Sequence, residues 1–299
     1  MEITFLGTST STPTKQRGHP AIHVKFLNHN LLWDCGEGAQ RQMILAGISP
    51  FRVSQVYITH EHGDHLLGLG GLIQTQGFLG RKEPLTVFGP RGIKKYVDFF
   101  ANWKYSFRDF KIEVREIKEG AVYEDQDYTI TAFKTDHLNC PALGYVFEEK
   151  VEVNLDKAKL KRMGLEGNPL CKELKENGKV QWKGRTFYLK DLSKPVRKGL
   201  KIAYTGDSVS CEEIEKAAKS ADVLICEATF AEDMKEKARE YGHMTAKEAA
   251  RIAKRAGVKR LILTHISPRY EEDPKIIEKE AREIFRNSDV ANDFMRIEI

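Results

Sequence analysis

A dense group of metal-binding side chains occupies residues 60–65, where the sequence reads His-Glu-His-Gly-Asp-His. Three imidazoles and a carboxylate within six positions are side chains that zinc takes as ligands. His60 and His62 are two apart in an extended segment and point the same way, so they can share one metal. Asp64 and His65 follow Gly63, which permits a tight turn, and can face a second metal. The cluster therefore predicts two metals rather than a solvated polar loop.

The elements that position such ligands can be predicted from apolar runs that end in a polar residue. Residues 53–59 lead into the cluster, and residues 128–135 lead into Asp136-His137. Residues 201–204 precede Asp207 in the same way, and residues 260–263 precede His265. Layered α/β folds build their sites where buried strands end, so we expect these ligands to meet. His60, His62 and His137 can hold one metal and Asp64, His65 and His265 the other, with the two oxygens of Asp207 bridging them.

Three further polar residues lie at the ends of predicted elements, and each has two interpretations. Asp34 follows residues 31–33, and it either orients a ligand histidine or caps the helix predicted at 39–46. Glu227 follows the apolar run from 224, and His243 precedes a helix predicted at 246–256. These two form either a pair that carries protons or an exposed glutamate and a helix cap.

The rest of the chain alternates strands with helices, which predicts an α/β fold. Further strands are predicted at residues 3–6, 21–26, 85–88, 112–117 and 295–299. Further helices are predicted at residues 66–73, 93–103 (ending at Trp103) and 275–285. His29 is expected in a hairpin turn at 28–30, and the segment 138–145 is not assigned to a strand.

Composition sets limits on the class of protein. A chain of 299 residues suits one large domain with an insertion, or two domains. The sequence shows no signal peptide and no apolar run of about 20 residues, so we expect a soluble cytoplasmic protein without a membrane span. Five scattered cysteines without a Cys-x-x-Cys pair predict reduced thiols rather than disulfides.

Positive charge is concentrated in one segment. Residues 150–201 hold 15 Lys and Arg against six Asp and Glu, although the whole chain has a net charge of only +5. A run of this kind is often only a solvated face, but its place between two ligands favours a module that grips RNA phosphates. Near the N-terminus, Pro13-Thr14-Lys15-Gln16-Arg17 is interpreted either as a plain turn or as a binding loop.

Taken together, these motifs resemble those of the ribonuclease Z family, tRNA 3′-processing endonucleases of the metallo-β-lactamase superfamily. The resemblance rests on both halves of the chain, and departs from the usual pattern at Gly18 and at Gly167-Asn168-Pro169. The motifs that carry it are Gly7-Thr8-Ser9, Pro13 to Arg17, Asp34 to Gly38 with Gln40-Arg41-Gln42, the 60–65 cluster, His137 with Gly144-Tyr145, Thr205 to Ser208, Glu227 to Phe230, His243 and Thr264-His265.

The resemblance implies a fold and an activity. The fold would be a single αββα sandwich over 1–299, in which 150–198 contains a protruding basic arm that binds tRNA. The enzyme would use two Zn²⁺ per protomer to cut precursor tRNA after the discriminator nucleotide, leaving a 3′-hydroxyl on the tRNA and a 5′-phosphate on the trailer. It would work as a homodimer in the cytoplasm.

The resemblance also implies roles for individual residues. Asp64 would accept a proton from the attacking water, and Glu227 with His243 would protonate the departing ribose oxygen. Substrate binding would involve residues of the N-terminal loop and the arm: Pro13, Thr14, Lys15, Arg17, Lys161 and Arg162.

Two rival functions fit parts of the sequence. A small-molecule phosphodiesterase, lactonase or thioesterase could use the same ligands, but it leaves the basic segment unexplained. A non-catalytic RNA-binding metalloprotein is the other rival, but structural zinc favours closed sites without a spare carboxylate such as Asp64.

Overall fold

The computed structural model describes residues 1–102, 104, 108–151, 154–194 and 198–299. The predicted helix end at Trp103 and two charges of the basic segment, Glu152 and Arg197, lie outside these residues. The chain forms two compact units. The first comprises Met1–Glu124, Thr129–Phe147 and Leu200–Ile299, and the second comprises Asp125–Tyr128 and Glu148–Gly199.

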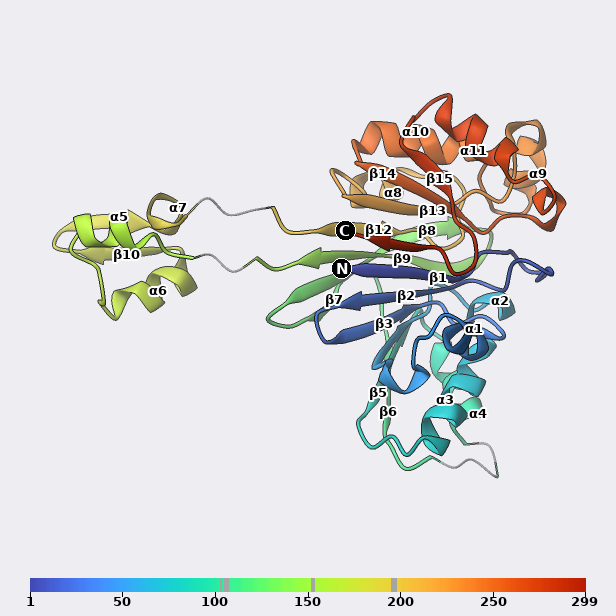
Figure 1. Ribbon diagram of the computed structural model, residues 1–299, viewed down its shortest axis with the longest axis horizontal. Helices are drawn as coiled ribbons and strands as arrows, with labels where there is room; N and C mark the ends of the chain where they lie inside the picture. The colour runs from blue at the N-terminus through green and yellow to red at the C-terminus, as the bar shows by residue number, and fades with distance from the viewer. Residues whose placement is uncertain (103, 105–107, 152–153, 195–197) are drawn as a thin grey trace. The chain divides into compact units, whose positions relative to one another are not determined.

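Two seven-stranded sheets form the centre of the first unit (Figure 1). The strands of one sheet, in spatial order, are β16 (Arg296–Glu298), β1 (Glu2–Gly7), β2 (Ala21–Phe26), β3 (His29–Trp33), β4 (Gln55–Tyr57), β5 (Leu85–Gly89) and β6 (Ile112–Glu116). Those of the other are β15 (Ser288–Val290), β14 (Arg260–Thr264), β13 (Val223–Glu227), β12 (Lys201–Tyr204), β9 (Cys140–Glu149), β8 (Tyr128–His137) and β7 (Gly120–Glu124).

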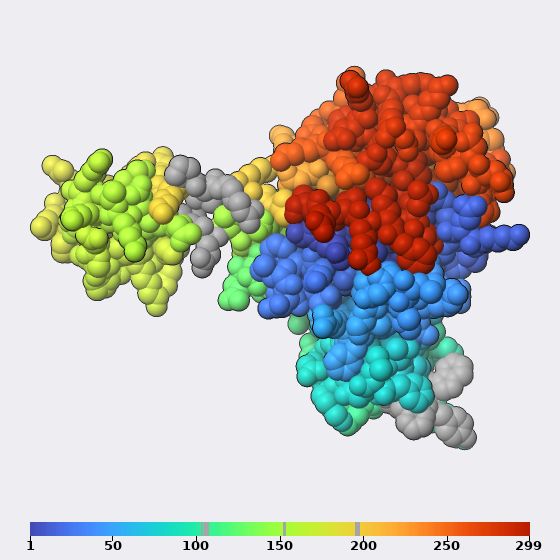
Figure 2. Space-filling view, in the orientation of Figure 1, coloured from blue at the N-terminus to red at the C-terminus, as the bar shows by residue number. Residues whose placement is uncertain are grey.

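Aromatic side chains join the inner faces of the sheets. Trp33 stacks on Tyr204 with ring centroids 5.6 Å apart, and Tyr57 meets Tyr145 edge to face at 5.3 Å. All four side chains are almost fully buried, so the space between the sheets is a packed core. Figure 2 shows the last residues of the chain, in dark red, against the N-terminal segment in blue, where β16 pairs with β1.

Helices cover the outer faces and complete an αββα sandwich (Figure 1), which confirms the predicted fold class. Beside the first sheet are α1 (Ala39–Leu45), α2 (Gly63–Leu66), α3 (Gly68–Phe78) and α4 (Ile93–Ala101). Beside the second are α8 (Glu212–Ala217), α9 (Lys235–Glu240), α10 (Ala246–Ala256) and α11 (Lys275–Arg282). Short 3-10 helices are η1 (Pro50–Arg52), η2 (Glu232–Met234) and η3 (Pro268–Tyr270).

Parallel strands β12, β13 and β14 bring three polar residues to one edge. Their apolar side chains are buried, which explains the continuous apolar runs in the sequence. Because the strands run in the same direction, Glu227 at the end of β13 lies beside Thr264, and Asp207 and His265 follow β12 and β14. Helix α10 starts in a capping box made by Thr245 and Glu248, so its bounds match the prediction of 246–256.

The second unit has regular structure where the sequence suggested only turns. It contains α5 (Lys157–Arg162), α6 (Leu170–Asn177), the hairpin β10 (Lys179–Trp182) and β11 (Arg185–Tyr188), and α7 (Leu189–Leu192). Leu160, Leu165, Leu174, Val180 and Leu192 form its own small core. These apolar residues are few and widely spaced among charges, so the periodicity that signals a helix is weak.

Several other elements differ from the prediction. Strands β7 and β15 and helix α8 were not predicted; β7 is mostly exposed and therefore lacks a clear apolar pattern. Strand β9 covers most of the unassigned segment 138–145, where Pro141 and Gly144 argue against a strand. His29 lies in β3 rather than in the turn. Within the described ranges, no helix is long and apolar enough to cross a membrane.

Candidate functional site

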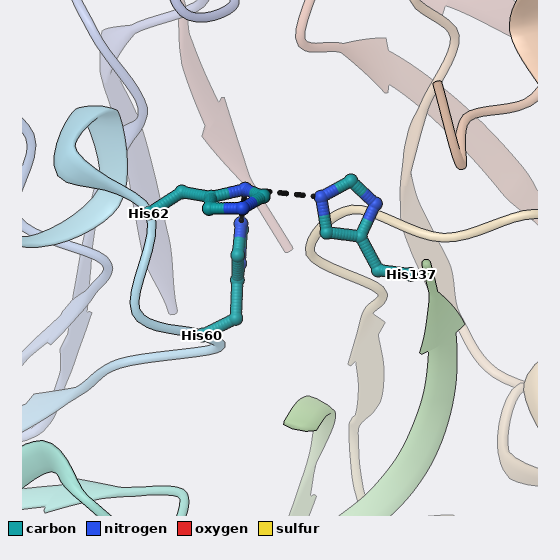
Figure 3. Close-up of side chains that lie close together, drawn as sticks. All are labelled: His60, His62 and His137. Carbon is teal, nitrogen blue, oxygen red and sulfur yellow. Dashed lines mark hydrogen bonds between the residues drawn. The ribbon is translucent and has the colours of Figure 1, made fainter. Parts of the chain in front are cut away.

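Three histidine nitrogens converge at the first predicted metal position (Figure 3). His60 Nε2 lies 3.0 Å from His62 Nδ1, which lies 3.1 Å from His137 Nε2. His60 and His62 come from the loop after β4, and His137 ends β8 in the other sheet. The site therefore forms where the two sheets meet, and the predicted set is assembled in space.

The second predicted set lies next to the first. Asp64, His65, Asp207 and His265 each offer one ligand atom within 4.8 Å of the others. Asp207 Oδ2 lies 3.2 Å from the Nε2 atoms of both His65 and His265, and 3.7 Å from His60 Nε2. This carboxylate therefore faces both sets, as a bridging ligand must.

Asp34 fixes the orientation of the second set. Its Oδ2 accepts hydrogen bonds from His65 Nδ1 at 2.8 Å and from the Tyr204 hydroxyl at 2.6 Å, and its Oδ1 accepts one from the Thr59 amide. The Nδ1 proton of His65 is thereby fixed, and Nε2 faces the site. The orienting interpretation of Asp34 is confirmed. The helix-cap interpretation is wrong, because α1 is capped by Gly38 without any side-chain hydrogen bond.

Other ligand histidines are held in the same manner by residues to which the sequence analysis gave no role of their own. His137 Nδ1 lies 2.8 Å from the Gly242 carbonyl oxygen, and His265 Nδ1 lies 2.9 Å from Thr229 Oγ1. Thr59 Oγ1 lies 3.0 Å from His60 Nδ1. Thr59 directly precedes the 60–65 cluster and Thr229 lies within the Glu227–Phe230 motif, so their hydroxyl groups were the available signal. The contact of Gly242 with His137 joins residues 105 positions apart, and nothing in the sequence signals it.

The side chains of the two ligand sets are suited to binding metal cations. Among the described residues, His65 Nε2, His265 Nε2 and Asp207 Oδ1 find no hydrogen-bond partner although they are buried, which is costly unless a ligand satisfies them. Burial disfavours a charged His65, yet the nearby carboxylates, Asp207 foremost, raise its pKa well above the ordinary value. A field that favours a proton this strongly also favours a metal ion, so the donor set suits a metal-dependent enzyme.

Glu227 and His243 form a buried pair at the side of the metal position. His243 Nδ1 donates to Glu227 Oε1 at 2.8 Å, and Glu227 also accepts from the Ser208 amide and the Thr229 hydroxyl. Burial alone would lower the pKa of His243, but the charge of Glu227 and this hydrogen bond raise it to about 9. The predicted pair is thus assembled, and His243 holds a proton at neutral pH. Neither an exposed Glu227 nor a His243 cap is present, since Thr245 caps α10.

An open cleft of about 710 Å³ gives access to the metal position and to His243. Five of the ligand residues line it, together with His243, and Lys237 and Arg269 add positive charge to its wall. The cleft is large enough for a substrate to approach the metal position and His243 together.

The N-terminal loop, residues 13–17, is flanked in sequence by residues that line this cleft, Thr12 and His19 among them. Its own side chains differ in exposure. Pro13 and Lys15 are exposed and Thr14 is half-buried, and all three line a hollow of about 340 Å³. Arg17 is only 4% exposed, and its guanidinium donates to Thr8 Oγ1, the Ala291 carbonyl oxygen and Asn292 Oδ1. Arg17 thus holds the base of the loop rather than facing solvent. Lys161 and Arg162 are exposed on α5 in the second unit.

Comparisons with known proteins agree with this geometry. Residues 1–166 match the family model described as Anti-Pycsar protein Apyc1, and residues 192–266 match the beta-lactamase superfamily domain. Among solved structures, the short form of human tRNase Z has 26% identity and a TM-score of 0.72, with 100% of this chain and 99% of that chain covered. The metallo-beta-lactamase fold protein YhfI from Bacillus subtilis, at 20% identity, shares the fold with a TM-score of 0.70 over 99% of this chain and 98% of that one.

Curated relatives extend the similarity along the whole chain. Ribonuclease Z from Methanothermobacter thermautotrophicus is 44% identical, with 100% of this chain and 97% of the relative covered. Ribonuclease Z from Bacillus velezensis is 38% identical, with 100% and 99% covered. Identity of this degree from end to end decides the assignment. The chain belongs to the ribonuclease Z family and has the metallo-β-lactamase fold.

Proposed function

We propose that this protein is a metal-dependent endoribonuclease that removes the 3′ trailer from tRNA precursors in the cytoplasm. The observation that carries the proposal is the convergence of seven ligand residues with the Glu227–His243 pair in one open cleft, in a chain that matches ribonuclease Z over its full length. The cut would follow the discriminator nucleotide, leaving a 3′-hydroxyl on the tRNA and a 5′-phosphate on the trailer.

Two Zn²⁺ ions are the cofactors that the donor set favours. His60, His62 and His137 would hold one ion and Asp64, His65 and His265 the other, with Asp207 shared between them. Such a pair of ions, when bound, stabilises the charge of the phosphate and makes a water acidic enough to attack at neutral pH. The proton transfers of the reaction would be carried out by side chains of the protein.

Asp64 would accept a proton from the attacking water. Burial would raise its pKa, but His65 and His265 outweigh burial and lower the pKa below the ordinary range, so Asp64 is an anion at neutral pH. On the leaving-group side, His243 would donate its Nε2 proton to the departing ribose oxygen. The buried carboxylate of Glu227 orients the ring and stabilises its charged form before the transfer.

Recognition of tRNA would involve the N-terminal loop and the second unit. Pro13, Thr14 and Lys15 would contact the RNA, and the buried Arg17 would position them. The exposed Lys161 and Arg162 of the second unit would contact backbone phosphates, which is how proteins bind A-form RNA without reading its bases. We further propose a homodimer, in which the second unit of one protomer presents RNA to the site of its partner.

Cleavage of a defined substrate tests this proposal. The purified protein should cut a 3′-extended tRNA precursor once, after the discriminator nucleotide, and much faster than it cuts bis(p-nitrophenyl) phosphate. Chelation should stop both reactions, and added Zn²⁺ should restore them. Hydrolysis of the small diester without any cleavage of the precursor would support a small-molecule phosphodiesterase instead.

Asp34→Asn should weaken the metal site while the fold persists. Asparagine has nearly the same shape, but it removes the charge and one acceptor from His65 Nδ1 and Tyr204. Changes to groups that orient metal ligands cost about 10–100-fold in metal affinity or activity. Competitive chelator titration should show a Zn²⁺ affinity lowered by this factor, with an unchanged far-UV circular dichroism spectrum. A Zn²⁺ affinity equal to that of the parent would contradict the proposal that Asp34 orients the ligand His65.

A further inference from the structure

A second hollow in the first unit, of about 450 Å³, lies outside the catalytic cleft and shares no residue with it. Its lining is mainly apolar, with Pro90, Ile117, Pro141, Ala142 and Leu143. Its rim is basic. Arg91, Lys118 and Lys134 come from three separate segments, and Glu119 is the one acid in the lining, which leaves a net charge of +2.

The three rim cations are free to bind an anion. Arg91, Lys118 and Lys134 are all exposed, and none has an ion pair or a hydrogen bond from its side chain within the described part of the chain. Some other exposed cations of the same unit are paired, as Lys94 is with Asp98 and Lys111 is with Glu113. Three unpaired cations around one apolar hollow are the arrangement that attracts phosphate groups.

The hollow is connected to the metal position by short stretches of backbone. His137 lines the catalytic cleft, and Pro141, four residues further along the β8–β9 hairpin, lines the hollow. The amide of Leu143 donates to the carbonyl oxygen of Thr59, the residue before His60. Lys134 lies on β8 three residues before His137. The segments that line this hollow are therefore continuous in the chain, or hydrogen-bonded, with segments that carry ligands of the metal position.

We propose that this hollow binds the 3′ trailer of the precursor as single-stranded RNA. An unpaired base would lie on Pro141 and Leu143, and the adjoining phosphates would contact Arg91, Lys118 and Lys134. Stacked, paired bases in A-form RNA cannot enter an apolar hollow, whereas single strands are bound by cations along the backbone and apolar surfaces under the bases. The inference rests on the proposed function, because it assigns a place to the product that the reaction releases.

Two precursors that differ only in trailer length test the proposal. One has a trailer of a single nucleotide and the other a trailer of about eight. The test protein is the triple variant Arg91→Ala, Lys118→Ala, Lys134→Ala. Its matched control is Lys219→Ala, Lys254→Ala, Lys279→Ala, which removes the same charge from exposed positions beside α8 and on α10 and α11. The measurement is kcat/KM for each precursor between 50 and 200 mM salt.

The test variant should lose about tenfold in kcat/KM on the long trailer, equivalent to about 1.4 kcal/mol, and less than about twofold on the short one. Its dependence of log kcat/KM on log salt should be flatter by up to about 2 for the long trailer, since each single-strand phosphate contact contributes about 0.7. In the control variant, kcat/KM should change by the same factor for the long and the short trailer.

An equal loss on both trailers, or no loss on either, would overturn the trailer assignment. An equal loss would mean that this surface binds the body of the tRNA, or attracts RNA non-specifically by its charge. Failure of the proposed function gives a different result, because the parent itself would then cut neither precursor.

Discussion

Replacing Asp64 by alanine is expected to abolish cleavage of precursor tRNA while the RNA still binds. The carboxylate lies 3.5 Å from His265 Nε2 and 3.6 Å from His65 Nε2, within the second ligand set. Its loss removes both the proton acceptor and a metal ligand, and we expect kcat to fall by at least about 10³, or about 4 kcal/mol in the barrier. Single-turnover cleavage and a filter-binding titration measure the two quantities.

The control for this experiment is Asp98→Ala, which removes a half-exposed carboxylate from α4 that pairs with Lys94, far from the ligand sets in sequence. Metal content is measured on both variants. A variant without Asp64 that keeps two metals but no longer cleaves the precursor supports the proton-acceptor role. One that binds fewer metals supports the ligand role alone. Cleavage at the parent rate would contradict both.

Removal of the second unit should strongly weaken the binding of precursor tRNA but should leave hydrolysis at the metal centre largely intact. The chain enters and leaves this unit at neighbouring points, since Gly199 approaches the Glu149 carbonyl oxygen closely enough to exclude a Cβ atom. A short Gly-Ser linker can therefore replace residues 151–198. The remaining sheets and their helices contain all seven ligands and both large cores. We expect the shortened protein to bind its metals as the parent does.

The shortened protein should lose most of its affinity for precursor tRNA, by about 100-fold or more at 150 mM salt. Every RNA phosphate that it can no longer neutralise should flatten the dependence of log K on log salt by about 0.7–0.9. Hydrolysis of bis(p-nitrophenyl) phosphate needs only the metal centre and should stay within about tenfold of the parent.

A point variant separates charge from folding in the second unit. Lys161→Ala with Arg162→Ala keeps the buried Leu160 and should reproduce part of the loss of tRNA affinity. Unchanged tRNA affinity and salt slope in both proteins would refute the RNA-binding role. Loss of metal together with both activities would show that the segment belongs to the fold of the catalytic unit.

The site was more predictable from sequence than parts of the fold were. His60, His137, Asp207 and His265 each stand at or just after the end of a strand that the apolar pattern predicts, and the chemistry of a ligand is visible in its residue type. Layered α/β folds build their sites at strand ends, so the four could be expected to meet, although His60 comes from one sheet and the other three from the second sheet. The structure confirms that they lie together.

What the sequence could not supply depends on tertiary contacts. The role of Gly242, whose carbonyl oxygen holds His137, is set by a backbone atom and not by a residue type. Arg17 looked like a group for RNA, but two of its three acceptors, Ala291 and Asn292, lie more than 270 positions away. In the second unit, short helices and a hairpin fold around a minimal apolar core, and such short elements have no clear period.

Metal stoichiometry tests the central claim most directly. The protein is stripped by a chelator, loaded with excess Zn²⁺, separated from unbound metal and analysed by mass spectrometry of the metal against protein concentration. Two adjacent ligand sets predict saturation at two Zn²⁺ per chain, and His137→Ala should reduce this to one because it leaves the second set intact. Saturation of the parent at one Zn²⁺ per chain, with all seven ligands present, would contradict the account.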